Sequence, residues 1–236
     1  MKSKTVAIVQ SNYIPWKGYF DLINKVNEFI LFDDVQYTAR DWRNRNLIKT
    51  PQGCIWLTIP LTKSPRSTKI KDKKIADHNW GKKHWQILTD HYAKAPYFST
   101  FREIFADLYL NSREVYLSQI NFKFIKAINK LLKIKTKISW SSDYEFVSGK
   151  TARLISLCQQ TGATQYISGP KAKSYIAASL FRKANVRLTW MDYANYPRYN
   201  QLYPPFVHEV SVLDLLFHTG PQARKYLNTA SRPRRI

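Results

Sequence analysis

Two adjacent carboxylates, Asp33 and Asp34, close a short apolar run and are the first candidates for chemistry. Carboxylates at the end of a strand can hold Mg²⁺, orient a hydroxyl group or take a proton from an amine. Neighbouring positions of a strand point to opposite faces, so we expect only one of the two to face a cleft.

A run of planar donors and aromatic rings follows the two carboxylates. Arginine offers forked donors for phosphate, diphosphate or carboxylate, and aromatic rings offer flat faces for a base or a sugar. The candidate substrate-binding residues of this run are Gln36, Arg40, Asp41, Trp42, Arg43, Asn44, Arg45 and Asn46, with Tyr37 as a further flat face. A salt-bridged surface loop is the alternative interpretation.

An earlier loop leads from the first apolar run into an amphipathic stretch. Open α/β sheets bind ligands at the carboxyl ends of strands, where the amides of the next helix can hold a phosphate. Gly18 would let the backbone approach such a group closely. The candidate binding residues of this loop are Gln10, Asn12, Tyr13, Trp16, Gly18 and Tyr19. Aromatic residues packed over the sheet edge are the alternative.

The segment Trp16-Lys17-Gly18-Tyr19 also has the outline of the His-x-Gly-His signature of nucleotidylyltransferases, although both histidines are absent. Ser168 and Gly169 join a predicted strand to a helix, so they repeat the anion-site pattern and could flank the same ligand; a plain chain reversal is the alternative. His84 could act as a general base, but a lone histidine on an apolar helix face is more often packed and hydrogen-bonded. A later group of side chains offers phenols and an amide, which could bind sugar hydroxyls: Tyr193, Tyr196, Tyr199 and Gln201. Packing of the tyrosines in the interior is the alternative.

The elements that must position these groups alternate between strand and helix. A β-branched run over 5–10, helical spacing of apolar residues from 19 to 26, and an apolar run over 28–32 predict strand, helix and strand. This order favours an α/β fold with a mostly parallel, doubly wound, Rossmann-like sheet. Later strands are predicted over 137–139, 165–167 and 186–190, with helices over 151–160, 170–181 and around 214–217.

Regular signals weaken between residues 35 and 80, where residues 55–59 predict one strand and residues 63–74 a mobile basic loop. Three helices follow over 80–92, 101–110 and 114–132. We therefore expect one domain over residues 1–236, with a helical insertion over roughly 80–133 and a basic disordered tail over 229–236.

The charge balance is strongly basic. Thirty-eight Lys and Arg face 16 Asp and Glu, for a formal net charge of +22. Such a field attracts nucleic acid, an anionic membrane face or phosphorylated substrates. No run of about 18 apolar residues and no signal peptide occur, so we expect a cytoplasmic protein without a transmembrane segment. Two cysteines cannot build a disulfide framework or a zinc site.

These segments, taken together and in this order, resemble the WbqC-like family of bacterial O-antigen gene clusters. The matching stretches are 10–20, 32–46, 56–60, 84–85, 95–98, 167–170, 211–217 and Gly220. The resemblance implies an acyl or aminoacyl transferase, with glycyl as the candidate group, acting on the amine of a nucleotide-linked amino sugar in O-antigen or other surface-polysaccharide synthesis. Asp33 or Asp34 would then orient or deprotonate the amine, and His84 is the alternative base. Arg40, Arg43 and Arg45 would bind the diphosphate.

Two other functions stay open at this point. A nucleotidylyltransferase-like enzyme would use ATP and Mg²⁺, and an RNA-binding module would explain the +22 charge. A tRNA carrying the activated glycine would also give this charge a purpose. Polyanion binding through many phosphates weakens steeply with added salt, whereas a sugar nucleotide held in a pocket responds less.

Overall fold

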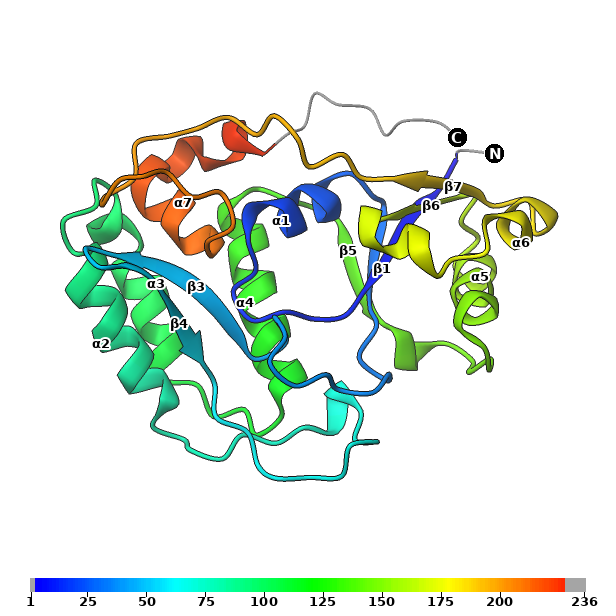
Figure 1. Ribbon diagram of the computed structural model, residues 1–236, viewed down its shortest axis with the longest axis horizontal. Coiled ribbons are helices and arrows are strands. Elements are labelled where there is room, and N and C mark those ends of the chain that lie inside the picture. Colours follow the sequence, from blue (N-terminus) through cyan, green and yellow to red (C-terminus); the bar gives the residue numbers. More distant parts are fainter. Residues whose placement is uncertain (1–2, 228–236) are drawn as a thin grey trace.

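A five-stranded parallel sheet forms the centre of the computed structural model, which describes residues 3–227 (Figure 1). Its strands are β1 (Thr5–Val9), β2 (Glu28–Leu31), β5 (Lys137–Trp140), β6 (Gln165–Ser168) and β7 (Arg187–Trp190). The strand order is β5-β2-β1-β6-β7, and every neighbouring pair is parallel. The chain winds outward from β1 in one direction and from β6 in the other, which confirms the Rossmann-like, doubly wound prediction.

Helices cover both faces of the sheet. They are α1 (Lys17–Asn24), α2 (Trp80–Tyr92), α3 (Phe98–Leu110), α4 (Leu117–Leu131), α5 (Lys150–Gln160), α6 (Ala178–Lys183) and α7 (Val212–Thr219). Successive strand residues point to opposite faces, so Ala7 and Phe29 pack into one core with α1, α4 and α7. Val6 and Ile30 pack into a second core with α5 and α6. No helix within residues 3–227 combines the length and apolarity needed to cross a membrane.

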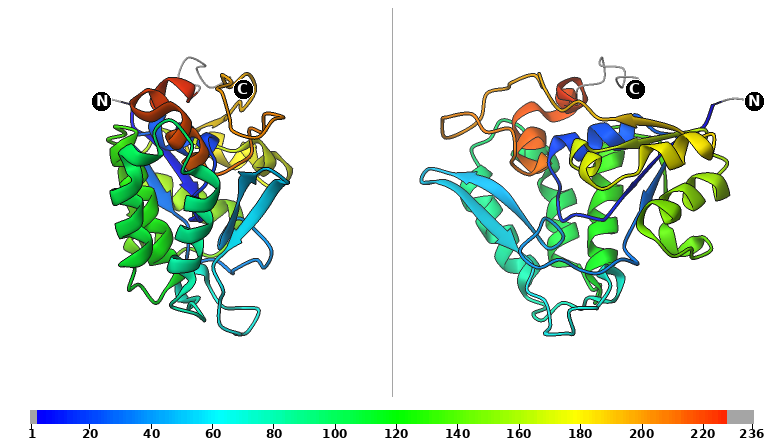
Figure 2. Two further views of the ribbon diagram at one scale, coloured as in Figure 1. Left: turned by 90° about the vertical axis from the view of Figure 1, so that its left-hand side faces the viewer. Right: turned by 45° about the vertical axis from the view of Figure 1, so that its right-hand side comes forward.

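An antiparallel hairpin, β3 (Arg45–Thr50) and β4 (Gly53–Thr58), lies outside the main sheet and is light blue in Figure 2. It lies beside α2, because the Lys49 amide donates to the Tyr92 hydroxyl at 3.0 Å and His84 Nε2 donates to the Thr58 carbonyl at 3.2 Å. The hairpin and helices α2 to α4 all lie between β2 and β5 in the chain. We did not predict β3, because polar and charged residues interrupt its apolar pattern.

One local prediction was wrong, and another stays a prediction. The helix predicted over 170–181 is a short 3₁₀ helix, Pro170–Ser174, followed by α6, because Ala177 has extended backbone angles between them. The loop predicted to be mobile over 63–74 contains the buried residue Ile70, whose amide donates to the Val35 carbonyl at 3.0 Å. The tail predicted over 229–236 lies outside the described residues.

Helices α2 and α3 pack closely at one glycine. A Cβ atom at Gly81 of α2 would lie 2.0 Å from the carbonyl oxygen of Tyr109 in α3. That oxygen is part of the backbone and cannot move aside, so the close contact between the two helices requires glycine at this position.

Candidate functional site

A cleft of about 380 Å³ opens at the carboxyl ends of β1 and β6, where the strand order reverses. Its walls are formed by Val9, Asn12, Pro15, Trp16, Tyr19, Leu22, Trp42, Asn46, Gly169, Pro170, Lys171, Tyr193 and Glu209. The loop after β1 and the turn after β6, which the sequence singled out separately, therefore flank one cavity. Doubly wound sheets bind ligands at this position.

Aromatic rings form much of the cleft. The Trp16 and Tyr193 rings meet edge to face with centroids 5.2 Å apart, and Trp42 contacts Trp56 at the same centroid distance. A Cβ atom at Gly18 would lie 2.3 Å from the Trp16 ring. Gly18 therefore makes room for an aromatic wall of the cleft, whereas the sequence suggested that it admits a phosphate.

Hydrogen bonds hold the loop after β1 against the β3 segment. The Asn46 side-chain amide donates to the carbonyls of Tyr13 and Ile14 at 3.1 and 2.9 Å. The Tyr13 amide donates to the Trp42 carbonyl at 3.1 Å. Ile14 has a positive φ of 36°, a strained conformation for a β-branched residue, which these contacts help to fix.

Asp33 lies directly beneath this loop. Its Oδ1 accepts the Ser11 amide at 2.7 Å, and its Oδ2 has no hydrogen-bond partner among the described residues. The side chain is only 1% exposed. Burial raises the pKa of Asp33 above its ordinary value, although the Ser11 hydrogen bonds and the nearby Arg43 charge act in the opposite direction.

Asp34 points to different partners. Its Oδ1 accepts the Ser141 hydroxyl at 2.5 Å, and its Oδ2 forms an ion pair with Arg153 of α5. The two carboxylates thus diverge, as the alternation of strand side chains predicts. They do not form a shared Mg²⁺ site, and no cluster of three His, Cys, Asp or Glu side chains between residues 3 and 227 is placed to hold a metal ion.

The three predicted arginines do not gather at the cleft. Arg43 flanks it, because its Nη1 donates to Oδ1 of the cleft residue Asn12. Arg45 stacks instead on Trp56, with the guanidinium carbon 4.1 Å from the ring centroid, and donates to the Arg40 carbonyl. Arg40 is exposed and has a positive φ of 58°. Only Arg43 is therefore placed to contact a ligand in the cleft.

Two polar residues of the same run, Asp41 and Asn44, have internal partners. Asp41 accepts the Trp42 amide at 2.7 Å and pairs with Arg43 at 3.4 Å. Burial alone would raise the pKa of Asp41, but Arg43 and this hydrogen bond lower it below the ordinary value. Asn44 accepts from the Tyr37 hydroxyl and donates to the backbone, whereas Gln36 is exposed. Asp41 thus helps to position the cleft residues beside it.

His84 and Tyr13 lie together in a buried aromatic cluster and do not line the cleft. The Tyr13 hydroxyl lies 2.9 Å from His84 Nδ1 and 3.0 Å from the Tyr109 hydroxyl. Burial lowers the pKa of His84 to about 4, so the ring is neutral at pH 7. This placement favours the packed, hydrogen-bonded role that the sequence left open for His84.

The remaining predicted residues divide between the cleft and the interior. The Tyr19 ring lines the cleft while its hydroxyl donates to the Gln10 carbonyl at 3.1 Å. Gly169 also lines the cleft, but a Cβ atom there would meet the Tyr193 hydroxyl only at 3.7 Å, so glycine is not sterically required. Ser168 is buried and accepts from the Tyr166 hydroxyl at 3.3 Å.

Of the later tyrosines, only Tyr193 lines the cleft. Tyr196 donates to Asp21 at 2.8 Å and Tyr199 donates to Asp214 at 2.7 Å, which are interior contacts. Sequence reasoning did not select Lys171 or Glu209 as site residues. Lys171 directly follows the predicted turn and could have been selected by its position, whereas Glu209 lies in an irregular segment without a recognisable pattern.

Comparison with known proteins identifies one family and one relative. The sequence profile of the WbqC-like protein family matches residues 10–226. A relative from Mycobacterium tuberculosis (strain ATCC 25618 / H37Rv), "Uncharacterized protein Rv1507c", is 48% identical over 225 residues, which cover 95% of this chain and 97% of the relative. No solved structure matches the chain at a significant level.

Proposed function

The chain belongs to the WbqC-like protein family, and from this premise we propose that it transfers an acyl group, with glycyl the first candidate, to the amine of a nucleotide-linked amino sugar. One observation carries the proposal. The cleft at the strand-order reversal combines aromatic faces, a cationic rim and a buried carboxylate beneath its loop. The aromatic faces match the base and the sugar, the cations match the diphosphate, and the carboxylate matches the amine.

The base and the sugar would lie against the flat faces of Trp16, Trp42 and Tyr193, which all line the cleft. Lys171, in the 3₁₀ helix that follows β6, and Arg43, hydrogen-bonded to Asn12, would bind the diphosphate. Glu209 on the cleft wall is an acceptor for a sugar hydroxyl or for the ammonium form of the amine. These contacts bind and orient the substrate.

Acyl transfer to an amine requires the nitrogen lone pair to be free. The amine nitrogen attacks the carbonyl carbon of an activated acyl donor, a C–N bond forms, and the bond to the leaving group breaks. Asp33 does not line the cleft, so the proton lost by the nitrogen passes to its Oδ2 through a water molecule. A carboxylate with a raised pKa suits this role, whereas Asp34 is occupied by Arg153.

The nucleotidylyltransferase-like alternative has less support. Trp16 and Tyr19, which replace the two histidines of the signature, both line the cleft. An indole and a phenol cannot replace imidazolium groups as charged donors to phosphate, and the Tyr19 hydroxyl already donates to the Gln10 carbonyl. The divergence of Asp33 and Asp34 also removes the pair of carboxylates that would have held Mg²⁺.

Mass spectrometry tests the proposed reaction directly. The purified protein is incubated with a panel of nucleotide-linked amino sugars, glycine, ATP and Mg²⁺, or with glycyl-tRNA, each with and without RNase. We expect one sugar nucleotide to gain the mass of an acyl group. Product that survives RNase identifies a free activated donor, and product that disappears identifies tRNA as the carrier. A complete absence of product with every donor and sugar contradicts the proposal.

A further inference from the structure

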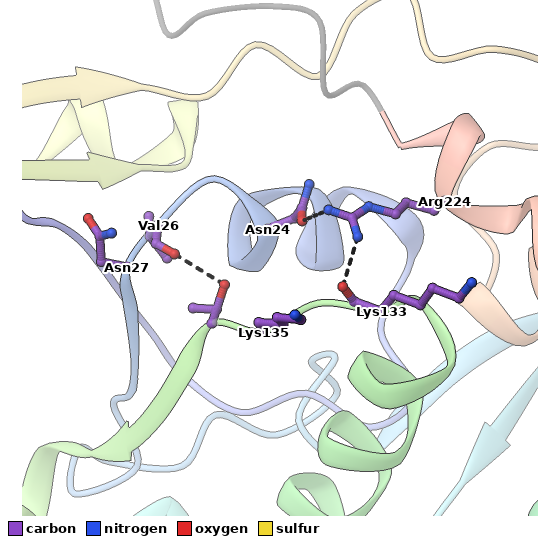
Figure 3. Close-up of a pocket in the computed structure, with 7 residues that line it drawn as sticks. Asn24, Val26, Asn27, Lys133, Lys135 and Arg224 are labelled. Atoms are coloured by element: carbon purple, nitrogen blue, oxygen red, sulfur yellow. Dashed lines mark hydrogen bonds between the residues drawn. The ribbon is translucent and has the colours of Figure 1, made fainter.

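A groove lies at the amino-terminal edge of the sheet, opposite the cleft. It consists of two adjoining hollows of about 460 and 590 Å³, which share Lys133, Lys135 and Thr136. Figure 3 shows the first hollow, between the end of α1, the turn into β5 and the segment that carries Arg224. We call it the basic groove, after its cations Lys126, Lys130, Lys133, Lys135 and Arg224.

The charges of the basic groove are free to bind an anion. All five side chains are exposed, and no residue that lines either hollow is acidic. None of the four lysines forms an ion pair with a carboxylate among residues 3–227. In a chain with a net charge of +22, the positive charges of the groove are therefore not balanced by nearby carboxylates. They lie on a concave surface, which concentrates their electric field.

Arg224 is held in place in the groove. Its guanidinium donates to the Lys133 carbonyl at 2.8 Å and to Oδ1 of Asn24 at 3.1 Å, as the dashed lines in Figure 3 show. Both acceptors are neutral, so the positive charge itself is not balanced. Orientation by neutral partners leaves this charge available to a ligand at a low cost in side-chain entropy.

Asn129 provides a second, independent observation. Its side chain is only 5% exposed and lines the groove, yet its Oδ1 has no hydrogen-bond partner among the described residues. Buried amides are almost always satisfied, so this group points to a partner that the protein alone does not supply. The unpaired amide oxygen can accept a hydrogen bond from a hydroxyl group of a ligand, such as a ribose hydroxyl.

The spacing of the cations indicates a ligand with several phosphates. Lys126, Lys130 and Lys133 follow one another at helical spacing along and just beyond α4, a distance of about 10 Å from first to last. One phosphate group is too small to contact this row, whereas a sugar–phosphate chain follows it. Grooves that bind nucleic-acid strands track the backbone in this way.

We propose that the basic groove binds the phosphodiester backbone of a nucleic acid. This site is separate from the sugar-nucleotide cleft, because the groove lies at the amino-terminal ends of β2 and β5 and the cleft at the carboxyl ends of β1 and β6. Both can therefore be occupied at once. The proposal also accounts for a net charge that a small substrate in the cleft does not require.

Fluorescence anisotropy of the full chain with a labelled RNA hairpin, measured over a series of salt concentrations, tests the groove. We expect the Lys133→Ala/Lys135→Ala double variant to bind RNA about tenfold more weakly than wild type at low salt. For this variant, the plot of the logarithm of the association constant against the logarithm of the salt concentration should be less steep by about 1.5. The matched control is Arg182→Ala/Lys183→Ala on α6, which removes the same charge from exposed positions elsewhere. The control should bind within about twofold of wild type.

Several outcomes would overturn the proposal. Equal losses in the two double variants would mean that net charge alone attracts RNA. Stronger binding of the wild type to anionic phospholipid vesicles than to RNA would identify a membrane surface instead. If the first variant does not fold, as judged by circular dichroism, Lys126→Ala/Lys130→Ala on exposed positions of α4 replaces it. Sugar-nucleotide binding should be unchanged in every variant, so failure here leaves the cleft function untouched.

Discussion

Asp33 and Asp34 are neighbours in the chain, but their carboxylates have different partners and therefore different chemistry. Asp34 is satisfied by Ser141 and Arg153, whereas Asp33 retains one unpaired oxygen beneath the cleft loop. The same contrast separates the arginines, since Arg43 flanks the cleft and Arg45 stacks on Trp56. At the scale of the residue, hydrogen-bond partners distinguish groups that the sequence presents as equivalent.

The Asp33→Asn variant should lose activity and gain stability. Removing the general base should lower kcat by about 10²–10⁴-fold. Because burial raises the pKa of Asp33, ionisation opposes folding at pH values above the ordinary 3.8, so the neutral amide should raise Tm by a few degrees at pH 7. This gain should disappear near pH 3. Calorimetry and initial rates measure the two effects, and unchanged kcat would remove Asp33 from the mechanism.

The Arg43→Ala variant should weaken sugar-nucleotide binding by about 1.5–3 kcal/mol, the scale of a lost charge-assisted hydrogen bond. Arg45→Ala is the matched control, because its guanidinium stacks on Trp56 and does not line the cleft. Isothermal titration calorimetry with the substrate identified by mass spectrometry compares the two variants. Equal affinity losses would show that the arginines act through general charge and not through contact.

At the scale of the element, predictions succeeded where a local run of residues is distinctive. The strand over 5–10 was found within one residue because it is a continuous β-branched run that is buried on both faces, and the helix predicted over 80–92 matches α2. The hairpin strand β3 was missed, since Asn46 and Lys49 hydrogen-bond to the distant residues Tyr13 and Pro205, which a local pattern does not include. The break in the helix predicted over 170–181 depends on backbone angles at Ala177 that composition does not reveal.

The Gly81→Ala variant tests the close packing of α2 against α3. Alanine normally favours a helix by about 1 kcal/mol, but here the new methyl group meets the Tyr109 carbonyl oxygen at 2.0 Å. We expect a net loss of stability of about 1–3 kcal/mol from overpacking. Chemical denaturation measures this loss, and Gly169→Ala, whose methyl group has room, is the control. A Gly81→Ala protein as stable as wild type would contradict the packing described.

At the scale of the whole molecule, the doubly wound topology brought the predicted segments together. Parallel strands end at a common edge, so the sequence left open whether the loops after β1 and β6 flank one ligand or only reverse the chain, and in the structure both loops line one cleft. The separation of that cleft from the aromatic cluster around His84 was not predictable, because it depends on how α2 packs. The position of Glu209 could not be predicted either, because Glu209 lies in an irregular segment after β7.

Stability should fall in two steps as the solution is acidified. The pKa of His84 is lowered by burial to about 4 from 6.5, so the unfolded chain binds the extra proton and up to about 3 kcal/mol is lost as pH falls from 6.5 to 4. Burial alone would raise the pKa of Glu28, but hydrogen bonds from Lys4, Tyr144, Lys137 and Ser139 lower it to about 2 from 4.5. Its contribution, about 1–2 kcal/mol after solvent screening, is lost between pH 4.5 and 2.

Urea unfolding at a series of pH values separates the two groups. His84→Gln should flatten the upper step alone, because glutamine keeps a donor and an acceptor without titrating. Glu28→Gln should flatten the lower step alone. If either variant leaves the pH dependence of the unfolding free energy unchanged, that residue is not responsible for its step.

The central strand of the sheet also affects how the chain folds during synthesis. β1 pairs with β2 soon after both are made, but its other edge waits for β6, which begins only at Gln165. At about 5–20 residues per second, the ribosome needs on the order of 10–30 s to make the intervening chain. During that interval the apolar edge of Val6 and its neighbours is open to strands of other molecules. Slower overexpression should therefore increase the soluble yield, and a nascent chain arrested before residue 165 should be a substrate for chaperones.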